Sequence, residues 1–212
     1  MNPFIYPKNR HKRQLEPGPF GTYQRYKPFL KKEFSSQCVY CRLPDGLKGY
    51  DSFGVDHYLP KSEFPELATV YSNLFYACNV CNRRKSDFWP TLRDKRERRI
   101  IVNPCDHIMF EHLKYNSVSV ESRTPEGSWT KDTLDLNERR TVEYRELLSG
   151  IINGYVKEKA KIVLAIKQIE AKIASDPGRS KELINEKNIA EEMMGRIEAR
   201  LNRILAEPEV IS

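Results

Sequence analysis

The sequence predicts an α+β fold: a small strand–strand–helix core stapled by zinc, a short β extension and a C-terminal α-helical hairpin. Two Cys-x2-Cys pairs bracketing short apolar runs predict the core, and isoleucines recurring at helical spacing after residue 150 predict the hairpin. The expected organisation is an N-terminal basic and aromatic arm at residues 1–34, the core at 35–92, the β extension at 93–136 and the hairpin at 137–212.

The arm combines positive charge with aromatic side chains. Residues 1–34 hold eight Lys/Arg against two acids, and tyrosines and phenylalanines alternate with cations from Tyr23 to Lys32. Such side chains can stack on bases and bind phosphates. They can equally pack on the domain and leave a solvated tail, and the two alternatives are compatible.

The core is expected to consist of a strand, a second strand and a helix, in that order. Residues 52–58 form a short strand that ends near a polar Asp-His pair, because Pro60 follows soon after. Residues 59–72 connect it to a second strand at 73–77, with a helical turn near 65–70. The second Cys-x2-Cys pair then leads into a short helix. The expected result is strand, strand and helix around a metal.

The four paired cysteines, Cys38, Cys41, Cys78 and Cys81, match the ligand set of a structural zinc site. Two residues between paired cysteines let both thiolates reach one ion, and four protein ligands leave no open position for catalysis. Redox pairs or chance spacing are the alternatives. Without an apolar signal or membrane-length run we expect a cytoplasmic, reducing location, which favours metal over disulfides. Cys105 is left over and is expected to be a buried thiol.

The second half is expected to hold a β extension followed by the hairpin. An apolar strand at 100–102, alternating stretches within 110–120 and a turn at 125–127 suggest the extension. Two stripes of Ile, Leu and Met broken at 176–178 suggest two antiparallel helices, with Gly150 and Gly154 near the start of the first. The hairpin is expected to pack within the chain, form a homodimer or dock a partner protein.

The charge balance suggests a polyanionic partner. The net charge is +7 and the pI about 9.1, and the surplus flanks the cysteine region, in residues 1–34 and 83–99. Charge alone does not separate nucleic acid from an acidic membrane or an acidic protein, and solvated surface is the alternative for each cation. The candidate phosphate contacts are Lys61, Arg83, Arg84 and Lys85.

Between the cysteine pairs lies a set suited to phosphodiester hydrolysis. His57 can act as a base near neutral pH, and Asp56 offers a hard oxygen to a divalent ion. Asn82 can bring an amide oxygen to the same ion, while Asn73 can hydrogen-bond backbone near His57. Singly, each has an ordinary structural explanation, such as a hydrogen-bonded pair, a turn residue or a helix cap. His107, with His112 five residues on, is a weaker candidate for extra ligands.

The joint pattern resembles the HNH endonuclease family. It reads Cys-x2-Cys, then Asp-His-x2-Pro-Lys-Ser, then Asn-Leu, then Cys-x2-Cys-Asn-x2-Lys, over residues 38–85. The resemblance implies a ββα-metal fold with His57 as general base, a divalent metal on Asp56 and Asn82, and Asn73 orienting the histidine. An asparagine in the third position suggests magnesium or manganese.

The resemblance implies an endonuclease that cleaves DNA, with RNA not excluded and no membrane partner. Residues 103–107 and 134–139 look like the tail of HNH proteins in bacterial and phage-defence systems, so a role in anti-phage defence or restriction is an expectation by analogy. Two rivals stay open. One is a non-catalytic zinc module that only binds nucleic acid, and the other is a subunit that docks a partner in a larger complex.

Overall fold

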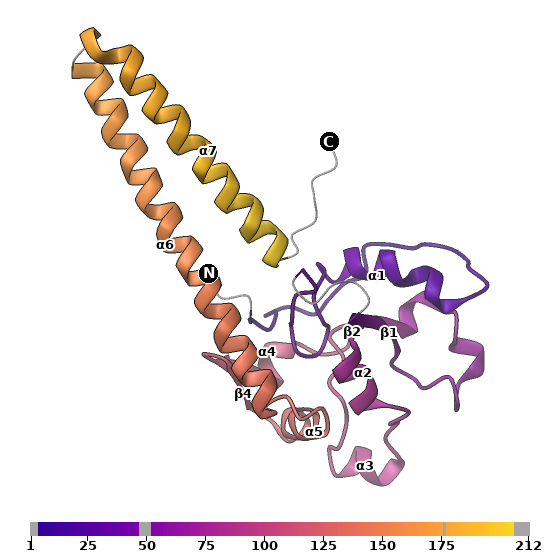
Figure 1. Ribbon diagram of the computed structural model, residues 1–212. Coiled ribbons are helices and arrows are strands. Elements are labelled where there is room, and N and C mark those ends of the chain that lie inside the picture. The colour runs from indigo at the N-terminus through magenta and orange to yellow at the C-terminus, as the bar shows by residue number, and fades with distance from the viewer. Residues whose placement is uncertain (1–3, 47–51, 176, 206–212) are drawn as a thin grey trace.

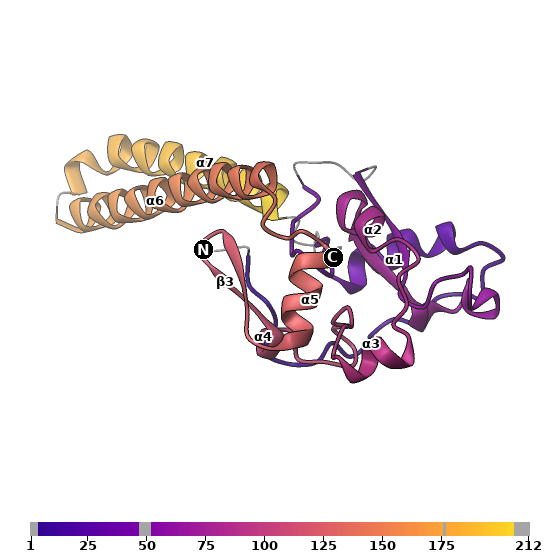
Figure 2. The same ribbon diagram turned by 90° about the horizontal axis from the view of Figure 1, so that it is seen from below.

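A computed structural model describes residues 4–46, 52–175 and 177–205. Figure 1 shows two parts: a compact body, and a long antiparallel pair of helices that projects away from it. Figure 2 gives the same impression after a quarter turn, with only one end of the pair against the body. The α+β class and the C-terminal hairpin predicted from the sequence are confirmed.

The core is a two-stranded antiparallel hairpin followed by a helix. Strand β1 (Phe53–His57) pairs with β2 (Leu74–Cys78), and α2 (Asn79–Lys85) follows directly. Every residue of β2 is buried, because both the N-terminal arm and α2 pack on it. The strand–strand–helix order expected for residues 52–85 is therefore present.

The segment between β1 and β2 folds back close to the end of β1. It contains two single-turn 3-10 helices, η3 (Pro65–Leu67) and η4 (Tyr71–Asn73), where one helical turn near 65–70 was expected. The second 3-10 helix, η4, ends at the residue before β2, so it sets the direction in which that strand begins. This placement brings backbone carbonyls of the connection next to the β1 terminus.

The N-terminal arm packs on the body. It forms η1 (Tyr23–Tyr26) and α1 (Lys27–Glu33), and upstream of them Phe4 and Tyr6 are 0% and 1% exposed. The ring of Tyr6 stacks on Tyr115 at 5.1 Å. Of the two expectations for the arm, packing of its aromatics on the domain is the one observed for these residues.

The 93–136 region is more helical than the sequence suggested. It contains α3 (Leu92–Arg96), α4 (Met109–His112), a hairpin of β3 (Leu113–Asn116) and β4 (Ser119–Ser122), and α5 (Pro125–Thr133).

Two expectations for this region are wrong. Residues 100–102 are irregular backbone, and their apolar side chains are explained by burial alone. The expected turn at 125–127 is the first turn of α5. Proline is well suited to the first position of a helix, and Thr124 caps it by accepting a hydrogen bond from Gly127 N at 3.1 Å.

The hairpin consists of α6 (Arg139–Ser175) and α7 (Ser180–Leu205). Helix α6 runs unbroken through Gly150 and Gly154, so it does not begin there as expected. Apart from the helix's own backbone, a Cβ placed at either glycine would meet no atom of the described residues within 4 Å. Within the described residues, no helix carries an apolar stretch of the length needed to cross a membrane.

The end of α7 returns to the body beside the first cysteine pair. A Cβ on Gly46 would lie 1.7 Å from the carbonyl oxygen of Arg203, so only glycine allows this approach. Ile197, Leu201 and Ile204 are buried at the same end. The hairpin is thus anchored at its base at both α6 and α7.

Candidate active site and zinc centre

The four paired cysteines converge on one point. Cys38, Cys41, Cys78 and Cys81 are buried, and their sulfur atoms all lie within 4.8 Å of one another. Cys41 Sγ and Cys78 Sγ are 3.7 Å apart. Four Zn–S bonds of ~2.3 Å in a tetrahedron place sulfur atoms about 3.8 Å apart. The cluster therefore fits a structural zinc ion with no open coordination position.

Local backbone geometry creates this convergence. The first Cys-x2-Cys pair, Cys38 and Cys41, is followed by a turn at Arg42, whose φ of 51° lies in the left-handed region. The backbone N–H of Arg42 donates to Cys38 O at 2.9 Å. In the second pair, Cys78 is the N-cap of α2 and accepts from Cys81 N at 3.5 Å. A thiolate at a helix N-terminus is favoured by the helix dipole.

The thiols differ in acidity. The other three thiols donate hydrogen bonds to Cys41 and lower its pKa well below the ordinary value, whereas burial raises the pKa of Cys38. A zinc ion supplies the positive charge that holds all four as thiolates.

His57 is the last residue of β1, opposite Leu74. Its Nε2 lies 2.9 Å from Ala68 O, a pure acceptor, so Nε2 carries the proton and Nδ1 keeps its lone pair. Among the residues that the structure describes, none hydrogen-bonds Nδ1. Burial lowers the pKa of His57, so the imidazole is neutral at pH 7. The Tyr23 ring packs edge-on at 4.7 Å between centroids.

Asn73 holds the chain around the histidine. It is buried, its Oδ1 accepts from Leu59 N at 2.8 Å, and its Nδ2 donates to Leu59 O at 3.0 Å and Leu67 O at 3.3 Å. Leu59 is two residues after His57, and Leu67 precedes Ala68, the acceptor of the His57 proton. Asn73 thus touches backbone on both sides of the imidazole, and orienting His57 remains the role expected for it.

Asp56 and Lys85 form a buried ion pair behind the histidine. Their exposures are 2% and 1%, and Lys85 Nζ donates to Asp56 Oδ1 at 3.2 Å and to His57 O at 2.6 Å. Tyr40 donates to the other carboxylate oxygen at 2.5 Å. The sequence analysis predicted that Lys85 contacts a phosphate. This prediction is wrong, because the side chain of Lys85 faces the interior. Cys81 and Lys85 are four residues apart on α2, so the face that carries the zinc ligand carries Lys85 inside too.

The remaining candidates are partly or fully exposed. Asn82 Nδ2 donates to Val55 O at 3.3 Å, which leaves the amide oxygen as a free acceptor within the described part of the chain. Arg83 points to solvent, and Lys61 Nζ lies 5.1 Å from the centre of the Tyr23 ring beside His57. Arg84 instead pairs with Asp135 at 3.1 Å. Arg83 and Lys61 are thus the candidate phosphate contacts left available to a ligand.

A divalent ion on Asp56 and Asn82 does not fit the arrangement as it stands. The Asn82 oxygen is available, but both Asp56 oxygens already have partners, one of them the Lys85 ammonium. Magnesium prefers several oxygen ligands in octahedral geometry with retained waters. To bind such an ion, Asp56 would have to exchange Lys85 for it.

Two further expectations concern the other histidines and the fifth cysteine. The rings of His107 and His112 are 5.3 Å apart, yet in residues 4–46, 52–175 and 177–205 the four-cysteine cluster is the one group of three or more potential ligands. Cys105 is partly rather than fully buried. None of these three residues joins the zinc cluster.

Sequence reasoning placed none of three further residues at the site, although Tyr23 was noted as part of the aromatic arm. Tyr40 lies inside the first Cys-x2-Cys pair, Tyr23 reaches the imidazole from the arm, and Arg145 lies beside the cysteines from α6. The tyrosines carry no local signal that could have placed them, because both contacts depend on packing between distant segments.

Comparison with known proteins assigns a class to the central segment. Residues 38–88 match the protein-family model described as HNH endonuclease, so this segment, called the HNH segment below, is similar to HNH endonuclease domains. It covers the zinc cluster, His57, Asn73 and Asn82.

A particular relative is Septu protein PtuB of Bacillus thuringiensis, which is 31% identical over 130 residues. The aligned region covers 58% of this chain and 47% of the relative, so the chain spans about half the length of the protein it matches. No solved structure matches this chain.

Proposed function

We propose that the protein is a metal-dependent HNH endonuclease that hydrolyses DNA phosphodiester bonds, with His57 as general base. The observation that carries the proposal is the His57 imidazole, which is fixed through Nε2–H to Ala68 O and keeps a free lone pair on Nδ1. A general base needs such a lone pair and a fixed orientation. The HNH match over residues 38–88 supports the same activity.

In the proposed reaction, His57 Nδ1 takes a proton from water as the oxygen attacks phosphorus, and the scissile P–O3′ bond breaks to leave a 5′-phosphate. The departing 3′ oxygen takes a proton from a solvent water to become the 3′-hydroxyl, and His57 then returns its own proton to solvent. Ala68 O stabilises the imidazolium through the Nε2 proton, and Asn73 holds the backbone that presents this carbonyl. A divalent ion, when bound, would stabilise charge on the phosphate and the leaving oxygen. The resemblance implies that Asp56 and Asn82 would hold this ion, which would require Asp56 to exchange its Lys85 partner for it.

Two exposed cations of the matched segment suit a phosphate backbone. Lys61 reaches over Tyr23, next to His57, and Arg83 is exposed on α2. Both are proposed to contact phosphates, because neither forms an ion pair with a carboxylate within the described residues. Lys85 is not proposed for this role, since it is buried against Asp56.

A role in anti-phage defence is proposed from the resemblance of the sequence to HNH proteins of defence systems, and the 31% identity to a Septu protein agrees with it. The projecting hairpin of α6 and α7 is proposed as the surface for a partner or a second copy. A cytoplasmic location is proposed with it, because phage DNA is accessible there.

The decisive experiment incubates purified protein with supercoiled plasmid in Mg²⁺ or Mn²⁺, beside His57→Ala and His107→Ala variants. Wild type and His107→Ala should cleave, whereas His57→Ala should lose about 10²–10⁴-fold in rate, the usual contribution of a general base. His107 is the matched control because it is another half-buried histidine outside the matched segment.

A control reaction contains EDTA to remove the divalent ion. The zinc content of the protein has to be measured for every variant and condition, because EDTA can also remove zinc from the cysteine cluster. A fully active His57→Ala protein rules out the proposed base. Absence of cleavage in any metal, together with salt-sensitive DNA binding, would instead favour the non-catalytic zinc module.

The pH dependence of cleavage should follow His57. Burial lowers its pKa below the ordinary value of about 6.5, although Ala68 O and the Asp56 charge oppose that shift. The neutral form is the base, so the rate should rise tenfold per pH unit below that pKa and be level from about pH 7 upward. Single-turnover cleavage rates between pH 5 and 9 measure this. A rate still climbing between pH 7 and 9 would point to a different proton acceptor.

A further inference from the structure

Arg145 is a buried cation without a carboxylate partner. It lies in the first turns of α6, outside the HNH segment, and is 0% exposed. Its Nη1 donates to Val118 O at 3.0 Å and to Leu136 O at 2.8 Å. Its Nε and Nη2 are buried and have no hydrogen-bond partner among the residues that the structure describes. No acidic group within the described residues is at ion-pair distance. A buried, unpaired charge is costly, so a counter-charge must lie nearby.

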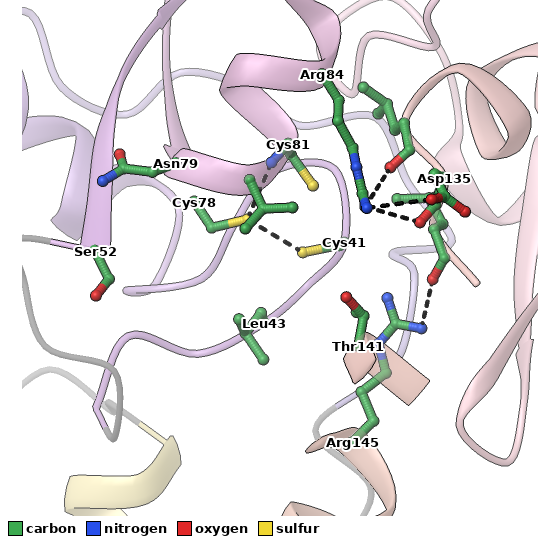
Figure 3. Close-up of a pocket in the computed structure, with 13 residues that line it drawn as sticks. Cys41, Leu43, Ser52, Cys78, Asn79, Cys81, Arg84, Asp135, Thr141 and Arg145 are labelled. Atoms are coloured by element: carbon green, nitrogen blue, oxygen red, sulfur yellow. Dashed lines mark hydrogen bonds and ion pairs between the residues drawn. The ribbon is translucent and has the colours of Figure 1, made fainter. Parts of the chain in front are cut away.

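The zinc cluster is the nearby source of negative charge. Arg145 lines a cavity of about 210 Å³ together with three of the four zinc-ligand cysteines. Figure 3 shows the sulfur atoms of Cys41, Cys78 and Cys81 on one side of this cavity and the guanidinium groups of Arg84 and Arg145 on the other. A zinc ion with four thiolates has a net charge of −2, because Zn²⁺ balances only two of them.

The two guanidinium groups in Figure 3 differ in how their charge is balanced. Arg84 has Asp135 at 3.1 Å and two backbone carbonyls. Arg145 has backbone carbonyls and the faces of aromatic rings, with its guanidinium carbon 5.1 Å from the centre of Tyr115. Tyr115 in turn donates its hydroxyl to Cys41 O at 2.8 Å. Arg145 is thus built into the wall of the zinc site.

A second cation adjoins the first cysteine pair in the chain. Arg42 directly follows Cys41, is half-buried, and donates to the side-chain oxygen of Gln37 rather than to a carboxylate. Its Nε is buried without a partner. Two guanidinium charges therefore balance the −2 of a zinc tetrathiolate, and neither has another counter-ion within the described residues.

We propose that Arg145, together with Arg42, is the counter-charge of the zinc site, so that α6 and the zinc cluster stabilise each other. The inference does not depend on nuclease activity, because it concerns the zinc cluster and the base of the hairpin. Zinc sites are tuned by such outer groups, whose removal commonly lowers metal affinity about 10–100-fold.

The test is competition for zinc against a chromogenic chelator, using the full chain and three variants. Arg145→Met keeps an unbranched side chain without charge, and should bind zinc about 10–100-fold more weakly. Arg145→Lys keeps the charge and should stay within a few-fold of wild type. Arg84→Met is the matched control, since Arg84 lines the same cavity but has its own carboxylate, and it should match wild type.

Two outcomes would overturn the proposal. One is an Arg145→Met protein with wild-type zinc affinity. The other is an equal loss in the Met and Lys variants, which would mean that the two backbone hydrogen bonds, not the charge, account for the effect. If Arg145→Met fails to fold, Arg42→Met replaces it, because Arg42 is next to Cys41 in the chain and is only half-buried. Unchanged zinc affinity in that variant would count against the charge argument as well.

Discussion

Replacing Lys85 with methionine is expected to lower the free energy of unfolding by about 3–5 kcal/mol, the usual cost of removing one partner of a buried ion pair. The Asp56 carboxylate would be left buried with only the Tyr40 hydroxyl, and the carbonyl of His57 would lose its 2.6 Å hydrogen bond. Urea unfolding measures this as a lower midpoint at unchanged slope.

Two companion variants make the measurement specific. Arg83→Met changes an exposed cation on the same helix and should alter stability by no more than about 0.5 kcal/mol. The double variant Asp56→Asn with Lys85→Met removes both charges and should recover much of the loss. If Lys85→Met unfolds at the same urea concentration as Arg83→Met, Lys85 is solvated and the pair does not form.

Loss of zinc should unfold the HNH segment. Structural zinc contributes about 10–16 kcal/mol in zinc-finger peptides, which is comparable to the whole stability of a domain. The strands here are five residues each and their sheet has two strands, so little else holds β2 and α2 against the first cysteine pair. Cys81→Ser should therefore lose bound zinc and the near-UV circular dichroism of the tyrosine-rich core, while far-UV helical signal from α6 and α7 persists.

Cys105→Ser is the control for that experiment. Cys105 is a free, partly buried thiol outside the cluster, and its replacement should leave one zinc per chain by elemental analysis. A Cys81→Ser protein with a full zinc content and an unchanged near-UV spectrum would mean that the cluster does not hold the metal.

The sequence predicted the core well because its constraints are local. The spacing of the cysteines, the residue types around His57 and the isoleucine stripe each depend on a few neighbouring positions, and the cysteine cluster, the strand pairing and the hairpin are all confirmed. The prediction of a turn at residues 125–127 was wrong for a specific reason. Proline and glycine mark turns and also suit helix starts, and only the Thr124 cap distinguishes the two.

The charges were harder to place, because burial of a cation is decided by packing across the fold. Arg83, Arg84 and Lys85 are consecutive, yet one faces solvent, one pairs with Asp135 and one is buried on Asp56. Helical spacing from Cys81 could have assigned Lys85 to the inner face. Arg145 offered no such signal, since it resembles any surface cation on a long charged helix. The roles of the site residues in catalysis stay predictions.

Helix α6 is continuous, so the hairpin is a rigid spacer of fixed length. Its 37 residues rise about 55 Å at 1.5 Å per residue. Both helices are fastened at the base, and α7 braces α6 through cross-helix ion pairs such as Lys187 Nζ to Glu170 Oε1 at 2.7 Å. Anything that grips the far tip is therefore held at a fixed reach from the body. Because the first turns of α6 lie on the body as far as the buried Ile152, the reach is set by residues 153–175, which rise about 35 Å at 1.5 Å per residue. That length equals about 10 base pairs of duplex DNA, at about 3.4 Å per pair.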